Sequence, residues 1–95
     1  MTANPKIEID ETIDTETKYM PLYKVLIHND DVNTMEHVTR VIMEIFKHEI
    51  KKAVEIMLEV HNTGVGLCTV EPLEHAEFHR DQLIAYSLTA TIEPD

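Results

Sequence analysis

The fold is decided by the stretch Ile27-His28-Asn29-Asp30-Asp31-Val32-Asn33-Thr34-Met35-Glu36, which joins two segments of different periodicity. Before it, residues 23–27 form a short apolar run rich in strand-forming residues. After it, apolar residues recur at the spacing of a helix. An amide and two carboxylates occupy the junction, and such side chains commonly bond the backbone of a turn. The stretch therefore predicts a strand, a polar turn and a helix, and it leaves open whether the turn is only structural or part of a site.

Two amphipathic helices are predicted to follow the turn. We expect Asn33 to cap the first helix, with Glu36 completing a capping box. The apolar stripe of this helix consists of Met35, Val38, Val41, Ile42, Ile45 and Phe46. Polar residues 47–49 interrupt the pattern, and a second stripe follows at Ala53, Val54, Met57, Leu58 and Val60. Gly64 can adopt the left-handed conformation that ends a helix, so the pattern predicts an αα-hairpin.

The remainder of the chain predicts a strand, a helix and a last strand. Residues 65–70 alternate, and Pro72 stands at the start of a helix, where proline is tolerated. The inward stripe expected for this helix is Leu73, Ala76, Arg80, Leu83 and Ile84. Residues 88–92 alternate again and close the chain. We therefore predict an α+β fold, a small α/β sandwich of order β-α-α-β-α-β, with a three-stranded antiparallel sheet packed against helices.

Length and charge limit the classes of protein to be considered. The 95 residues suffice for one folded domain, expected at residues 21–95, behind a flexible acidic extension over residues 1–20. The net charge of −10 argues against nucleic-acid and anionic-membrane surfaces and suits a cationic partner. Because there is no signal-peptide pattern or long apolar run, we expect a soluble cytoplasmic protein, or a plastid stromal one without its transit peptide. The single cysteine, Cys68, is expected to be a buried, inert thiol.

The predicted hairpin brings the polar turn close to the end of the second helix. His61 lies at that end, so we expect it beside Asn29, Asp30 and Asp31. For the same reason, the apolar residues that should face one another are Met35, Val38, Met57 and Val60. An apolar pocket with hydrogen-bond acceptors at its rim suits an ammonium group attached to an apolar group, because an ammonium presents three donors and no acceptor.

A metal site is the competing interpretation of the same turn. His28, Asp30, Asp31 and His61 offer the mixed nitrogen and oxygen ligands that suit zinc or manganese. On the last helix, His75 and His79 are four residues apart, but Glu77 does not directly follow the first histidine as in zincins. We find no motif for an activated nucleophile and too few glycines for a phosphate-binding loop. We therefore expect no enzyme, no bound metal and no cofactor, with a small metal-dependent hydrolase as the alternative.

The chain resembles the ClpS family, adaptors of the bacterial and plastid Clp proteases that recognise N-terminal degrons. The resemblance extends from about residue 23 to the end and is most specific over residues 23–31, 35–38 and 56–64. Two positions depart from the family pattern: Asn33 stands where threonine is common, and Thr34 replaces the usual proline.

The resemblance implies a binding site for the N-terminal residue of a substrate protein. Asn29, Asp31 and His61 would hold the α-amino group, and Asp30 would support the same turn. The first side chain, a large one such as that of Leu, Phe, Tyr or Trp, would enter a pocket lined by Ile27, Asn33, Met35, Val38, Met57, Val60 and Leu88.

The resemblance also implies a protein partner. The folded body would dock on the N-terminal domain of a Clp ATPase of the ClpA or ClpC type, and the N-terminal extension would engage the ATPase during hand-over. Glu74 matches an acidic docking position, and His79 occupies the neighbouring basic one. We expect a monomer without nucleic-acid or membrane partners. A fold of this kind that regulates the ATPase without binding degrons is the alternative within the family.

Overall fold

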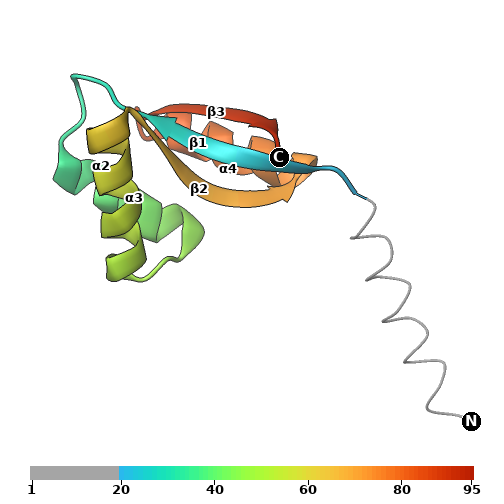
Figure 1. The fold of residues 1–95 in the computed structure, drawn as a ribbon, viewed down its shortest axis with the longest axis horizontal. Coiled ribbons are helices and arrows are strands. Elements are labelled where there is room, and N and C mark those ends of the chain that lie inside the picture. Colours follow the sequence, from blue (N-terminus) through green and yellow to red (C-terminus); the bar gives the residue numbers. More distant parts are fainter. Residues whose placement is uncertain (1–19) are drawn as a thin grey trace, which may run out of the picture.

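Three strands and three helices make up the fold of residues 20–95, the part of the chain that this computed structural model describes. In chain order they are β1 (Leu22–His28), α2 (Met35–Phe46), α3 (Ile50–Thr63), β2 (Val65–Pro72), α4 (Leu73–Ala85) and β3 (Thr89–Pro94). The predicted order β-α-α-β-α-β is confirmed (Figure 1). The flexible extension predicted at the N-terminus lies outside the described residues, apart from Met20.

The sheet is antiparallel, and β1 is its central strand. The strand order is β2-β1-β3, and Ile27 pairs with Gly66 on one side and with Ala90 on the other. The register of β1 and β2 shifts between Val25 and Leu26, which are opposite Thr69 and Leu67, so that Cys68 is the extra residue of a bulge. Burial raises the pKa of the Cys68 thiol to about 12, with a smaller contribution from Glu59. The predicted burial of this cysteine is therefore confirmed.

The helices cover one face of the sheet. In Figure 1, α4 runs behind the strands, and the α2–α3 hairpin lies at the end of the sheet where β1 finishes. The largest fully buried side chains of the resulting core are Ile27, Ile42, Leu83, Val25 and Val41. On the opposite face, no helix of residues 20–95 covers Leu67, which is 38% exposed.

The cap of α2 differs from the prediction. Thr34, not Asn33, is the N-cap, and its hydroxyl accepts a hydrogen bond from the His37 backbone N–H at 3.0 Å. The Asn33 side chain instead donates to Asp30 Oδ2 and to the Ser87 carbonyl oxygen. Because the helix begins one residue later, Glu36 lies in its first turn without completing the predicted capping box.

Replacing this cap tests its contribution to stability. We expect Thr34→Ala to lower the free energy of unfolding by about 1 kcal/mol, because the N–H of His37 loses its acceptor. Urea unfolding followed by circular dichroism measures this difference. Thr34→Ser, which keeps the hydroxyl, is the matched control, and equal stability of the two variants would contradict the assignment of the cap.

The inward stripe predicted for α4 is only partly correct. Ala76 and Leu83 are fully buried, but Leu73 and Ile84 are 41% and 52% exposed. The helix begins at Leu73, with Pro72 as its N-cap rather than its first residue. Leu73 and Ile84 lie eleven residues apart, about three full turns, so they share a face that points away from the sheet.

Candidate functional site

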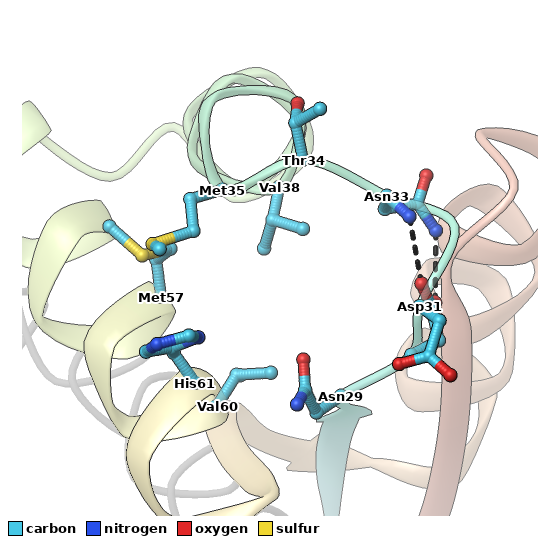
Figure 2. A pocket seen from close by; sticks show the side chains of 10 residues that line it. Asn29, Asp31, Asn33, Thr34, Met35, Val38, Met57, Val60 and His61 are labelled. Atoms are coloured by element: carbon cyan, nitrogen blue, oxygen red, sulfur yellow. Dashed lines mark hydrogen bonds between the residues drawn. The ribbon is translucent and has the colours of Figure 1, made fainter.

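A pocket of about 330 Å³ lies between the polar turn and the α2–α3 hairpin (Figure 2). It is lined by Asn29, Asp30, Asp31, Asn33, Thr34, Met35, Val38, Met57, Val60 and His61. Figure 2 shows these side chains in a ring around open space, with the turn on one side and the two methionines on the other. Its volume falls in the range of small-ligand pockets.

The end of α3 is attached to the turn through the backbone. The Asn29 N–H donates to the Gly64 carbonyl oxygen at 2.9 Å. Gly64 ends the helix in the left-handed conformation, with φ of +91°, and its own N–H donates to the Val60 carbonyl oxygen. As predicted from the hairpin, His61 therefore lies at the same pocket as the turn.

Asp30 organises the turn itself. Its Oδ1 accepts from the backbone N–H groups of Val32 and Asn33, at 2.9 and 2.8 Å, and its Oδ2 accepts from the Asn33 side chain at 2.9 Å. The Thr89 hydroxyl lies 3.4 Å from the same Oδ2. The backbone hydrogen bond from Asn33 is the main cause that lowers the pKa of Asp30 below its ordinary value. The lone pairs of this carboxylate are thus largely used within the protein.

The hydrogen bonds to Asp30 should make the free energy of unfolding depend on pH in the acid range. Since the pKa of Asp30 is lower in the folded chain than in the unfolded one, its ionised form stabilises the fold above the unfolded-chain value, about 4. This stabilisation is lost as the pH falls through the folded-state pKa. We expect Asp30→Asn to be less stable than wild type by a constant amount from pH 5 to 7, and by a smaller amount below about pH 4. Urea unfolding at each pH measures the difference, and a difference that grows towards low pH would contradict the account.

Three polar groups at the pocket have no partner in the rest of the folded part. Asn29, Asp31 and His61 are exposed, and their side chains make no hydrogen bond to any residue of the range 20–95. A carboxylate oxygen, an amide oxygen and an unprotonated ring nitrogen all accept hydrogen bonds. Together they form a rim that can receive a cationic donor.

The apolar wall of the pocket comes from the two helices. Val38 and Val60 are 9% and 4% exposed and form its inner surface. Met35 is 47% exposed and Met57 is half-buried, so the two methionines lie closer to solvent. Methionine side chains are flexible and polarisable, which lets such a wall adapt to side chains of different shapes.

Two residues expected at the pocket do not line it. Ile27 and Leu88 are 1% and 4% exposed, and both belong to the central core. The inward position of Ile27 on β1 places its side chain between the sheet and the helices. Conversely, Thr34 lines the pocket and was not predicted to do so. Its place directly before α2 is the only sequence signal that could have indicated this.

Of the four residues of the competing metal site, Asp30, Asp31 and His61 line the pocket, but His28 does not join them. His28 Nε2 lies 2.6 Å from the Thr91 hydroxyl on the neighbouring strand, and His28 does not line the pocket. Within residues 20–95, no three His, Cys, Asp or Glu side chains gather closely enough to hold a metal ion.

No helix in this part of the chain is both long and apolar enough to cross a membrane.

The two residues expected to dock the ATPase lie on α4. Glu74 is exposed in the first turn of the helix. His79 is half-buried: its Nδ1 lies within hydrogen-bond distance of Glu71 Oε2, and its ring packs against Phe46 at a centroid distance of 4.9 Å. The ring of His79 is therefore held against β2 and α2.

Comparison with known proteins decides the family. The family model described as "ATP-dependent Clp protease adaptor protein ClpS" matches residues 18–91. The chain belongs to the ClpS family. A ClpS from Gloeobacter violaceus is 52% identical over 81 residues, covering 84% of this chain and 87% of the relative. A ClpS from Synechococcus elongatus is 44% identical over 82 residues, covering 85% and 86%.

A solved structure supports both the family and the fold. Agrobacterium tumefaciens ClpS2 bound to L-phenylalaninamide is 27% identical, with a TM-score of 0.73, over 79% of this chain and 98% of that one. The resemblance to ClpS and the α+β fold predicted from the sequence are thus confirmed. Membership makes this chain an adaptor protein of the ATP-dependent Clp protease.

Proposed function

We propose that this ClpS-family adaptor binds N-degrons, which present a free α-amino group on a large hydrophobic residue such as Leu, Phe, Tyr or Trp, and delivers them to a Clp ATPase–protease. The observation that carries the proposal is the pocket, in which three unpartnered polar groups stand beside an apolar wall. The bound ligand of Agrobacterium ClpS2 supports it, because L-phenylalaninamide presents a free amine next to a benzyl side chain.

The α-amino group of the substrate is bound by the polar rim of the pocket. An ammonium has three N–H donors, and Asp31, Asn29 and His61 can supply a carboxylate oxygen, an amide oxygen and a ring nitrogen as acceptors. The carboxylate of Asp31 makes the strongest of these bonds, since ionised partners roughly double the strength of a hydrogen bond. Asp30 is a positioning residue, because its own oxygens hold the turn. Acetylation of the amine removes the charge and two donors.

The side chain of the first substrate residue is bound by the apolar wall of the pocket. It enters between Met35 and Met57 and reaches the buried surfaces of Val38 and Val60. A larger apolar side chain displaces more water and gains more contact, so affinity rises with its buried area. A short or polar first residue leaves the pocket partly unfilled or loses its own hydration.

The ATPase is proposed to bind at the far end of the molecule. Pro72, which precedes α4, pairs with Leu22 at the start of β1, whereas Asn29 directly follows its end. Seven strand residues separate these ends by about 20 Å. Glu74 in the first turn of α4, with His79 one turn further along, can thus contact the N-terminal domain of a ClpA- or ClpC-type ATPase while the pocket is occupied. In this proposal the adaptor is a cytoplasmic monomer without catalytic activity of its own.

A delivery assay tests the proposal. A reporter that begins with Leu should be degraded by the Clp ATPase–protease only when this protein is added, and an otherwise identical reporter that begins with Met should persist. The Asp31→Asn variant should fail to deliver the Leu reporter. If wild type and Asp31→Asn changed ATPase activity equally and neither delivered the Leu reporter, the protein would be a regulator without degron binding.

A further inference from the structure

A second cavity adjoins the pocket on its helical side. This groove has a volume of about 400 Å³ and is lined by Met35, Glu36, Thr39, Arg40, Met43 and Met57. Met35 and Met57 line both cavities, and they form the edge of the pocket that lies across from the turn (Figure 2). The groove is therefore a continuation of the pocket beyond its methionine edge.

The groove is within reach of the residues that follow the first one of a bound polypeptide. In the proposed complex, the amine lies at Asn29, Asp31 and His61; Figure 2 shows the first two across the pocket from the methionines and His61 beside Met57. Successive Cα atoms are 3.8 Å apart, and an extended chain advances by about 3.5 Å per residue. A substrate chain that leaves over the methionine edge consequently brings its second or third residue above the groove.

The chemistry of the groove suits an apolar side chain. Three of its lining residues are methionines, Met35, Met43 and Met57, and Met35 is 47% exposed. Glu36 and Arg40, both exposed, also line it with opposite charges, and neither forms an ion pair within residues 20–95. With no net charge in this lining, a charged side chain gains little there and loses hydration against the methionines.

We propose that this methionine groove is a second subsite of the peptide-binding site, which takes an apolar side chain from position two or three of the substrate. The inference rests on the proposed function, because the groove receives these positions only when the first residue occupies the pocket. With this subsite, the selectivity for substrates depends on the second or third residue as well as on the first.

Methionine-methyl NMR tests the subsite directly. The chain has five methionines, and Met43 lines the groove without lining the pocket. The probes are peptides beginning Leu-Gly-Gly, Leu-Leu-Gly and Leu-Gly-Leu, otherwise identical, each with an acetylated counterpart. We expect all free-amine peptides to shift the signals of Met35 and Met57. Only peptides with a second leucine should also shift the signal of Met43, and the better of them should bind roughly three- to tenfold more tightly than Leu-Gly-Gly.

Two variants separate the subsite from general destabilisation. Met43→Gln keeps the length of the side chain but makes the lining more polar, so it should reduce the affinity ratio between the leucine and glycine peptides. Leu58→Gln, at an exposed site outside both cavities, should keep that ratio. Equal binding of all free-amine peptides without a Met43 shift would overturn the subsite and leave the proposed function standing. No binding of any free-amine peptide would overturn both.

Discussion

Asp31→Asn is expected to weaken the binding of a peptide with a free N-terminal Leu or Phe by about 10- to 100-fold. The substitution preserves the shape of the side chain and one acceptor oxygen, but it removes the negative charge opposite the α-ammonium. Asp31 makes no hydrogen bond within residues 20–95, so its loss should leave the turn intact. Fluorescence anisotropy with labelled peptides measures the change in affinity.

The control for this prediction is another exposed aspartate. Asp95→Asn removes one negative charge, as Asp31→Asn does, but Asp95 lies beside Leu22, at the other end of β1 from the pocket. We expect its peptide affinity to stay within twofold of wild type, because a distant surface charge is largely screened. If Asp31→Asn behaved like this control, the α-amino group would not be read by Asp31.

Gly66→Ala is expected to lower the free energy of unfolding by about 1–3 kcal/mol through overpacking. A Cβ at this position would lie 2.6 Å from Val60 Cγ2 and 3.0 Å from the Ile56 carbonyl oxygen. The carbonyl belongs to the backbone of α3 and cannot move alone, so the helix or the strand must shift. Because Val60 also lines the pocket, peptide affinity should fall together with stability. Urea unfolding and anisotropy measure the two effects.

Gly64→Ala is the matched comparison. Its added Cβ would meet no atom within 4 Å, so the cost comes only from the left-handed backbone, with φ of +91°. An L-residue with a side chain pays about 1–2 kcal/mol for that conformation. Gly66→Ala should therefore be the more destabilised of the two variants. The reverse order would show that α3 and β2 are not packed as tightly as the structure has them.

The order of elements was predictable because each has a strong local pattern, whereas the cap of α2 was not. Asn33 and Thr34 are both good cap residues. The Asn33 side chain is instead bonded to Asp30 and to the carbonyl oxygen of Ser87, which is 54 positions away. No local pattern contains the contact with Ser87.

Part of the pocket lining was predictable from the local patterns that define the hairpin. The hairpin alone places Met35, Val38, Met57 and Val60 opposite one another, as the structure has them. Periodicity can identify Ile27 as buried, but it cannot distinguish a core position from a cavity wall.

Periodicity also failed to identify all the buried residues of α3. The structure buries Ala53, Ile56 and Val60, whereas the predicted stripe included Leu58, which is 43% exposed, and omitted Ile56. The buried seam is set by β2, where Gly66 allows Ile56 and Val60 to approach closely.

The central claim is that the pocket binds an apolar N-terminal residue through its free amine. The most direct test is an anisotropy titration of wild-type protein with one labelled peptide that begins with Phe and with its N-acetylated form. The account predicts saturable binding of the free peptide and at least about 100-fold weaker binding of the acetylated one, since the charge and two donors are lost. Equal affinity for both forms would contradict the claim.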